Sequence, residues 1–280
     1  HPLSVGASVR LRALQQAAAA SDALLVVGSE LGDSDLWEGR ISAAAVVRVD
    51  VDAAQLNKNC MATVALHADA SAALRALRAA VPASRADGAE RARDLRAACR
   101  KEARADAGRC EEINAAVRAA LPADAVLTGD SSQVTYFGSV HFFDVPAPRR
   151  FCYTPGYATL GYGLPAAIGA ALARPGRPVA ALLGDGALMF SVQELATLAE
   201  LRLPVPVVVV DNGGYREIRD QQAARGIPPT AVDLPSPDFA AMATAMGAHG
   251  MRATDLAALT ALVADALTAD RPTLVHLDVR

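Results

Sequence analysis

The sequence predicts an α/β protein built on a doubly wound parallel sheet, and three observations support this fold class. Hydrophobic residues make up 52% of the chain while aromatic residues make up only 4%. The apolar content is therefore mostly Ala, Val and Leu, which suits helices packed over parallel strands. Short Val- and Leu-rich runs also alternate with helix-like segments. The length of 280 residues allows one large domain or two medium ones.

The first 82 residues predict a small block of strands and helices. The apolar run Asp22–Ser29 is typical of a buried parallel strand, and the runs Ala43–Asp52 and Ala62–Asp69 predict a second and a third strand. The segment after them carries apolar residues at helical spacing and ends near Pro82. The composition then changes.

Residues 83–108 are rich in Arg, Asp, Glu and Ala. They predict a charged linker that becomes a solvent-exposed helix, with charge pairs at i,i+4 spacing. Because acids interleave with the basic residues and the net charge is −3, the sequence does not favour a nucleic-acid partner.

Residues 109–280 return to alternation and predict the larger domain. Solid Val/Leu strands between helices are typical of a doubly wound parallel sheet. The expected elements, in chain order, are helix Glu111–Leu121, strand Ala125–Asp130, helix Gly163–Ala173, strand Pro178–Asp185, helix Ser191–Leu201, strand Val205–Asn212, helix Asp238–Met246, a helix over 254–269 and a strand over 272–279.

The four cysteines form no CxxC pair, which favours buried or incidental thiols in a reducing, cytoplasmic compartment. No apolar run has membrane-spanning length, so we expect no membrane partner. The chain starts with His-Pro and shows no signal-peptide pattern, and we interpret it as a fragment.

Three loops follow the predicted strands of the larger domain: Gly129–Gln133, Gly184–Leu188 and Asp211–Tyr215. In a doubly wound sheet, ligands bind outside the carboxyl ends of the strands. All three loops carry small residues and oxygen ligands. We therefore expect them to meet at one edge of the sheet.

The residues of two of these loops suit a divalent cation with a diphosphate. Mg²⁺ prefers oxygen ligands, and Asp185 offers a carboxylate, Asn212 an amide carbonyl and Gly214 a backbone carbonyl. Gly186 and Ala187 would open a helix whose free N–H groups favour a phosphate. The simpler alternative makes Asp185 only the N-cap of that helix.

A second glycine-rich stretch, "GYGLPA" (Gly161–Ala166), matches the GxGxxA dinucleotide pattern. It does not follow an apolar strand. A nicotinamide site would also need a separate acid after the next strand, but that strand ends in the Gly-Asp-Gly turn itself. The sequence does not favour a dehydrogenase.

The span from "GDG" (Gly184–Gly186) to "DNGG" (Asp211–Gly214) resembles the thiamine-diphosphate motif of the pyruvate decarboxylase and acetolactate synthase family. "LGYGLPAAIGAAL" resembles the helix that precedes this motif in the family. "HPLSVG" and "DALLVVGSEL…VVRVDVDAAQLNKN" resemble the second half of the family's middle domain, which is Rossmann-like. The resemblance covers nearly the whole chain. The resemblance implies three parts. Residues 1–82 would form the second half of the middle domain, residues 83–108 the linker, and residues 109–280 the pyrophosphate-binding domain.

The resemblance also implies site residues. Asp185, Asn212 and the Gly214 carbonyl match the family's Mg²⁺ ligands, and Leu160 matches the apolar residue that wedges between the two rings of the cofactor. Asp211 departs from the family's usual first Asn. The positions implied for cofactor binding are Ser131, Ser132, Gln133, Leu160, Gly184, Asp185, Gly186, Ala187, Asn212, Gly214 and Tyr215.

The implied chemistry is decarboxylation of a 2-oxo acid, with the cofactor as the electron sink. In the family, a Glu on a separate pyrimidine-binding domain activates the cofactor, and the sequence contains no such domain. We therefore name no catalytic residue and expect this portion to be inactive alone. Glu217, Ile218 and Gln221 either border the substrate or form a solvated helix face. The resemblance also implies a homodimer or tetramer.

The branch of the family is left open. The Arg-containing loop that serves FAD in acetolactate synthases is poorly matched here by "GSELGDSDLWEGR". A better resemblance, to the 5-guanidino-2-oxopentanoate decarboxylase branch, is found in "GSELGDSD", "GDSSQVTYFG" and "AVDLPSPDFAAMA". A guanidinium substrate would need an acid, and Glu217 or Asp220 is a candidate. The alternatives are an acetolactate synthase-type carboligase and a cofactor-binding subunit of a split enzyme.

Overall fold

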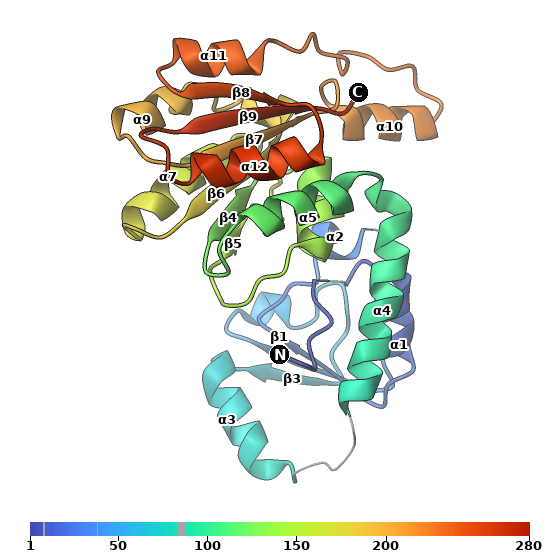
Figure 1. The fold of residues 1–280 in the computed structure, drawn as a ribbon. Helices are drawn as coiled ribbons and strands as arrows, with labels where there is room; N and C mark the ends of the chain where they lie inside the picture. The colour runs from blue at the N-terminus through green and yellow to red at the C-terminus, as the bar shows by residue number, and fades with distance from the viewer. Residues whose placement is uncertain (8, 38, 83–87) are drawn as a thin grey trace. The chain divides into compact units, whose positions relative to one another are not determined.

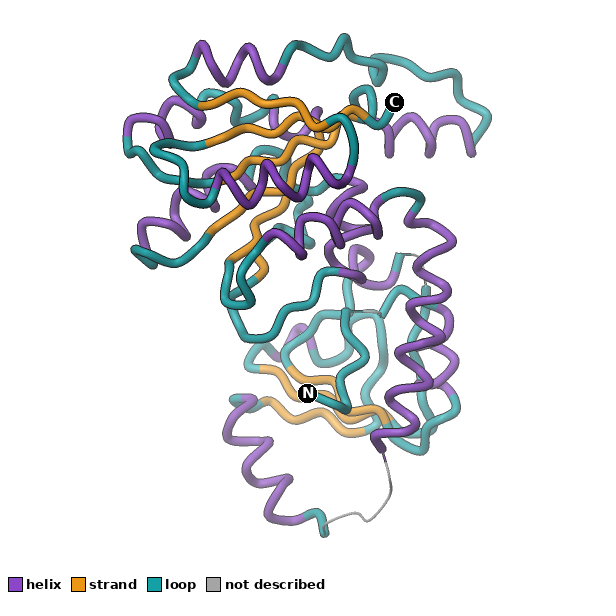
Figure 2. The backbone as a smooth tube through the Cα atoms, viewed as in Figure 1, coloured by secondary structure: helices purple, strands orange, loops and turns teal. Residues whose placement is uncertain are grey.

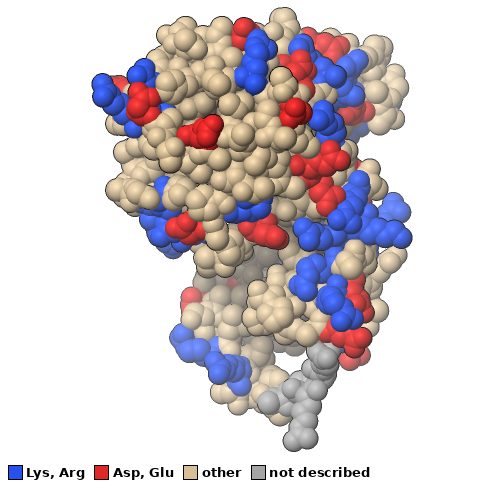
Figure 3. Space-filling model, viewed as in Figure 1, with Lys and Arg blue, Asp and Glu red and all other residues tan. Residues whose placement is uncertain are grey.

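The computed structural model describes residues 1–7, 9–37, 39–82 and 88–280, which form two compact units, His1–Asp106 and Ala107–Arg280. The predicted segment 83–87 of the linker lies outside the described residues. Within the described part of the chain, no helix is both long and apolar enough to cross a membrane. Acidic and basic side chains are interspersed over much of the face drawn in Figure 3.

The first unit contains a small parallel sheet in the order β1-β2-β3. Each strand lies inside the apolar run that predicted it. The elements of this unit are α1 (Arg12–Ala19), β1 (Leu24–Val27), α2 (Asp33–Leu36), β2 (Val46–Asp50), the 3₁₀ turn η1 (Ala53–Gln55), β3 (Val64–His67), α3 (Ala70–Ala80) and α4 (Gly88–Ala107).

The prediction of a solvent-exposed helix after the linker was wrong in part. Helix α4 forms, but Cys99 and Ala103 are buried. Its Glu102 carboxylate accepts hydrogen bonds from the N–H groups of Arg12 and Ala13, at 2.8 and 2.9 Å. These are free amides at the start of α1, which attract a negative charge. The side of α4 that carries Cys99 and Ala103 is therefore packed inside the protein and is not exposed to solvent.

The second unit is built on a parallel sheet with the strand order β5-β4-β6-β7-β9-β8. Figure 2 shows these strands as one twisted layer. The strands are β4 (Val126–Gly129), β5 (Phe151–Cys152), β6 (Val179–Gly184), β7 (Pro206–Asp211), β8 (His249–Ala253) and β9 (Thr273–Asp278).

Helices cover both faces of this sheet, which confirms the doubly wound prediction (Figure 1). One apolar core joins the sheet to α7, α9 and α11, and the other joins it to α5 and α12. The helices are α5 (Cys110–Ala120), the π-helical turn η2 (Val134–Ser139), α6 (Val140–Phe142), α7 (Gly163–Ala173), α8 (Asp185–Leu188), α9 (Glu194–Glu200), α10 (Arg216–Ala224), α11 (Phe239–Ala245) and α12 (Leu256–Ala266).

The two faces of β6 show why its sequence forms a buried strand. Ala181 and Leu183 pack in one core, while Ala180 and Leu182 pack in the other. A strand that is buried on both faces must be apolar at successive positions, and not only at alternate ones. The continuous run "VAALL" satisfies this requirement.

The chain leaves β4 toward β5 on one side and then returns to β6 on the other. This reversal is the topological switch point, where ligands of doubly wound sheets bind. The loops that follow β4, β6 and β7 leave the sheet at its carboxyl edge. The fold therefore places the predicted site residues next to the switch point.

Candidate functional site

The loops after β4 and β6 are in close contact. A Cβ atom on Gly184 would lie 2.9 Å from the Cβ of Ser132. A Cβ on Gly163, at the start of α7, would lie 3.0 Å from the Gly129 backbone. Glycine at both positions therefore allows backbone segments to approach more closely than any side chain permits.

The loops after β6 and β7 also meet, through Asp185 and Gly214. The Gly214 N–H donates to Asp185 Oδ2 at 2.6 Å. A Cβ on Gly186 would lie 2.9 Å from the Tyr215 ring and 3.3 Å from the Gly214 carbonyl oxygen. The "GDG" and "DNGG" clusters thus come together although 29 residues separate the two hydrogen-bonded positions.

Asp185 is the first residue of α8, one position inside that helix. The N-cap position is Gly184, so the simpler alternative of an N-cap Asp does not describe this residue. Burial raises the pKa of the Asp185 carboxyl, the Gly214 N–H lowers it, and the negative charge of Asp211 raises it again. A cation bound here would relieve this unfavourable burial of charge.

Gly214 has a backbone conformation that a side chain would oppose. Its φ is +110°, and a Cβ would lie 2.6 Å from the Val232 carbonyl oxygen. Gly214 pairs with Asp233 in an isolated antiparallel bridge. The preceding Gly213 also has a positive φ, at +93°. This double left-handed turn reverses the chain after β7 and requires glycine.

Asn212 reaches the loop after β4. Its Nδ2 donates to Gln133 Oε1 at 3.1 Å, so its amide oxygen is the end that remains for a cation. Among the described residues, no three His, Cys, Asp or Glu side chains gather to hold a metal. A cation would need the predicted mixture of carboxylate, amide and backbone oxygens, which are hard ligands that suit Mg²⁺.

Gln133 connects Asn212, in the loop after β7, to two acids on α10. Its Nε2 lies 3.1 Å from Glu217 Oε2 and 3.2 Å from Asp220 Oδ2. Burial, together with the negative charge of Glu217, raises the pKa of the Tyr136 hydroxyl. Sequence reasoning placed Gln133 only beside a diphosphate, and it missed the contact with Glu217 and Asp220.

Asp130 is a functional candidate that the sequence did not single out. Its carboxylate is fully buried. It accepts hydrogen bonds from the Gly163 N–H at 2.9 Å, the Gly161 N–H at 3.1 Å and the Ser131 N–H at 3.2 Å. Burial raises its pKa, while these amides lower it. Asp130 thus holds the start of α7 against the end of β4.

Asp130 also explains why "GYGLPA" is not a dinucleotide site. In a GxGxxG turn the free amides bind a pyrophosphate. Here the amides of Gly161 and Gly163 bind the chain's own carboxylate. Leu160 lies directly before this cradle, in the segment between β5 and α7. The contacts of Asp130 therefore hold the backbone directly after Leu160.

The remaining predicted residues lie around the three loops. Ser131 Oγ donates to the Thr154 carbonyl at 3.2 Å, Ala187 is buried within α8, and Tyr215 packs against Phe190 with ring centroids 6.3 Å apart. The structure thus brings Ser132, Gln133, Gly184, Asp185, Gly186, Asn212, Gly214 and Tyr215 into contact around one edge of the sheet.

Comparison with known proteins agrees with this geometry. Residues 130–277 match the model of the thiamine pyrophosphate enzyme C-terminal TPP-binding domain, and residues 1–77 match the model of the central domain of the same enzymes. The first match covers more than half of the chain.

Two curated relatives match most of the chain. The "Probable 2-ketoarginine decarboxylase" of Pseudomonas aeruginosa is 36% identical over 260 residues, which are 91% of this chain and 46% of the relative. The acetolactate synthase isozyme 2 large subunit of Escherichia coli is 32% identical over 264 residues, which are 92% of this chain and 48% of the relative. The chain spans about half the length of these relatives.

A solved structure has the same fold. The thiamine diphosphate-dependent 4-hydroxybenzoylformate decarboxylase of Rhodococcus jostii RHA1 superposes with a TM-score of 0.74 at 23% identity, over 95% of this chain and 50% of that one. The family model, the relatives and the meeting of the three loops agree, and the chain belongs to the thiamine pyrophosphate enzymes of the acetolactate synthase and 2-oxo acid decarboxylase family.

Proposed function

We propose that this chain binds Mg²⁺ and the diphosphate of thiamine diphosphate, as part of a 2-oxo acid decarboxylase. The observation that carries the proposal is the contact between Asp185 and Gly214, which joins the two halves of the motif at 2.6 Å. When bound, the cofactor supplies the electron sink for the charge left when CO₂ departs.

The chain's own residues have binding and orienting roles in this proposal. Asp185, Asn212 and the Gly214 carbonyl hold the cation, which neutralises the diphosphate. The amides at the start of α8, with the loop Ser131–Gln133, bind the phosphate oxygens. Leu160 supports the bent shape of the cofactor.

The proposal includes a dependence on a second domain. In it, a pyrimidine-binding domain carrying a Glu lies elsewhere in the same polypeptide or on another chain, and it completes the site. The proposed assembly is a homodimer or tetramer in the cytoplasm. The family resemblance and the share of the relatives' length that this chain covers support this part.

Residues 1–280 alone are expected to bind Mg²⁺ and thiamine diphosphate weakly and to turn over no 2-oxo acid. Calorimetry with the cofactor measures the first, and CO₂ release measures the second. Adding the pyrimidine-binding domain should restore activity. Robust turnover of any 2-oxo acid by residues 1–280 alone would contradict the proposal.

We further propose a substrate with a guanidinium group. Glu217 and Asp220 both contact Gln133, which in turn contacts the predicted metal ligand Asn212. This arrangement places two carboxylates one side chain away from the metal loop. Carboxylates pair strongly with a guanidinium group through charge-assisted hydrogen bonds. The name of the Pseudomonas relative refers to such a substrate.

Glu217→Gln is expected to weaken use of the guanidinium substrate in the complete protein. The kcat/KM for 5-guanidino-2-oxopentanoate should fall about 10-fold or more, because one charged hydrogen bond contributes about 1.5–3 kcal/mol. The kcat/KM for the neutral 5-ureido analogue should change little. Decarboxylation assays with both compounds measure the difference.

The control for this experiment is Asp233→Asn, which removes a carboxylate that pairs with the outward Arg219 of α10 at 3.3 Å. It should leave both substrates unaffected. Equal losses for the charged and neutral compounds in Glu217→Gln would exclude a role in recognising the guanidinium.

A carboligase is the second candidate, and the similarity to the Escherichia coli acetolactate synthase subunit favours it. The same assays separate the two functions. Formation of acetolactate from pyruvate at a higher kcat/KM than CO₂ release from the guanidinium substrate would favour the carboligase. A partner subunit that carries the pyrimidine-binding domain would identify a split enzyme.

A further inference from the structure

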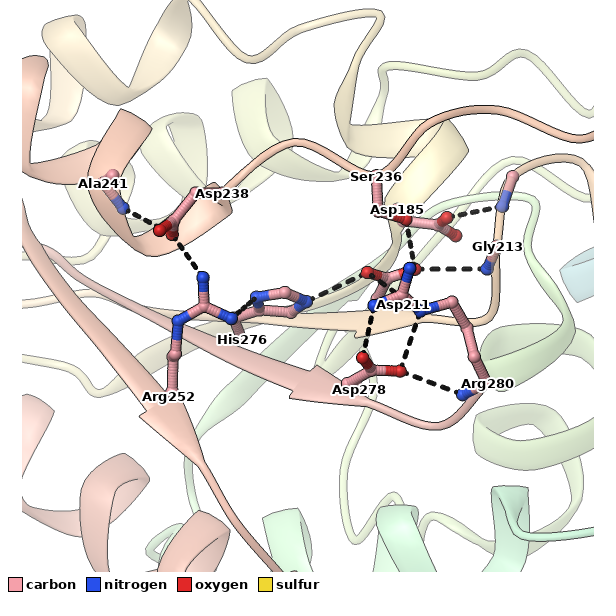
Figure 4. A network of polar contacts seen from close by, with 11 residues as sticks. Asp185, Asp211, Gly213, Ser236, Asp238, Ala241, Arg252, His276, Asp278 and Arg280 are labelled. Carbon is pink, nitrogen blue, oxygen red and sulfur yellow. Dashed lines mark hydrogen bonds and ion pairs between the residues drawn. The ribbon is translucent and has the colours of Figure 1, made fainter.

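The Asp211 carboxylate, at the end of β7, is fully buried and accepts three hydrogen bonds (Figure 4). Its Oδ1 accepts from the Gly213 N–H at 3.1 Å and from Ser236 Oγ at 2.8 Å. Its Oδ2 lies 3.1 Å from His276 Nε2. Both carboxylate oxygens therefore accept hydrogen bonds, and Asp211 links the Gly213 backbone, Ser236 and His276.

His276 can donate to Asp211 because of its other neighbour. Arg252 Nη1 lies 3.4 Å from His276 Nδ1. A guanidinium group only donates, so Nδ1 accepts and Nε2 carries the hydrogen. Arg252 is itself held by Asp238, at 2.7 Å. Asp238 also accepts from the Ala241 N–H and caps α11.

This chain of contacts crosses three adjacent strands. Arg252 on β8 is level with His276 on β9, and His276 is level with Val209 on β7. Asp211 lies two residues after Val209, and side chains two residues apart on a strand share a face. The register of the sheet therefore brings His276 and Asp211 together from positions that are 65 residues apart.

The turn that follows Asp211 is held by two carboxylates. Asp211 accepts from the Gly213 N–H, and Asp185 accepts from the next amide, that of Gly214. Both glycines have positive φ angles, and neither has a side chain that would restrict its backbone. With two successive amides held, the Gly214 carbonyl and the Asn212 side chain are fixed relative to Asp185.

We propose that Asp211 is a positioning residue for the cation ligands Asn212 and Gly214, and that His276 and Ser236 hold its carboxylate in one orientation. This inference rests on the proposed function. An Asn at position 211 would not substitute, because its NH₂ group must face either the His276 Nε2–H or the Gly213 N–H. Both of these groups are donors.

The test measures metal affinity directly. The free Mn²⁺ signal in electron paramagnetic resonance gives the Mn²⁺ affinity of the complete protein with saturating thiamine diphosphate. Asp211→Asn should bind Mn²⁺ about 10-fold more weakly or worse, which is the usual effect of removing a group that orients a metal ligand. His276→Leu should behave in the same way.

Two variants separate positioning from general stability. His276→Gln keeps a donor toward Asp211 and should retain Mn²⁺ affinity within about three-fold of wild type. Asp255→Ala removes the side chain that caps α12 by accepting from the Ala258 N–H at 2.8 Å. It should lower the melting temperature and leave Mn²⁺ affinity unchanged.

Mn²⁺ affinity in Asp211→Asn within two-fold of wild type would overturn the inference, and so would equal losses in His276→Gln and His276→Leu. If Asp211→Asn does not fold, the two His276 variants decide by the same measurement. If wild type binds no Mn²⁺ with the cofactor, the proposed function fails as well. Tight binding in wild type and in every variant overturns this inference alone.

Discussion

Asp185→Ala is expected to abolish Mg²⁺-dependent binding of thiamine diphosphate by the complete protein. The substitution removes the carboxylate of the predicted cation site. It also removes the acceptor of the Gly214 N–H, at 2.6 Å, so the Gly214 carbonyl loses its fixed direction. Because one change affects two of the three proposed ligands, the affinity should fall by roughly 100-fold or more. Calorimetric titration with the cofactor and Mg²⁺ measures the loss.

Two further variants sharpen this experiment. Asp185→Asn keeps an oxygen that can accept from Gly214 but loses the negative charge, so its affinity should lie between wild type and Asp185→Ala. Asp278→Asn removes an exposed carboxylate on β9 that pairs with Arg280 and should bind normally. Cofactor binding retained in Asp185→Ala would show that the site is assigned to the wrong residues.

The contact between the "GDG" and "DNGG" clusters could be predicted, because it requires only that the two strands before them are neighbours in the sheet. Val- and Leu-rich runs identified β6 and β7, and these strands are neighbours in the sheet. Strands that run parallel end at the same edge. Residues that directly follow them, Asp185 and Asn212, are then close whatever the order of the other strands.

The link between His276 and Asp211 could not be predicted, because it depends on the whole strand order. The sequence predicts a strand over 272–279 but does not indicate that β9 pairs with β7 and with β8. Strand β8 was missed because "HGMRA" is short, lies at an edge and is largely exposed. Without a predicted strand β8, nothing in the sequence places Arg252 beside His276.

Asp130 was missed for a different reason. Its partners are backbone amides of Gly161 and Gly163, which lie 31 and 33 residues away. Every residue except proline carries such a donor, so the sequence contains no side-chain pattern that marks the pair. Helix α10 was predicted only as one of two alternatives, the solvated helix face around Glu217, because "REIRDQQAA" has no buried residue and little apolar periodicity.

Asp130→Ala is expected to destabilise the second unit by about 3 kcal/mol, because the half-buried amide of Gly161 and the buried amide of Gly163 lose a charged acceptor and each buried unsatisfied group costs about 1–3 kcal/mol. Denaturant unfolding of the cofactor-free complete protein measures this change. Asp130→Asn keeps one acceptor oxygen and should lose less. A loss no larger than that of Asp255→Ala, which uncaps α12 at an exposed position, would contradict the role given to Asp130.

Unfolding with and without the cofactor separates the two predicted effects. A ligand that binds only the folded state raises its stability in proportion to the logarithm of its concentration over Kd. Asp185→Ala should lose this increment while its cofactor-free stability stays near wild type, since losing the Gly214 acceptor is offset by relief of repulsion from Asp211. Asp130→Ala should already be less stable without cofactor, because its carboxylate holds α7 and the segment containing Leu160 before any ligand arrives.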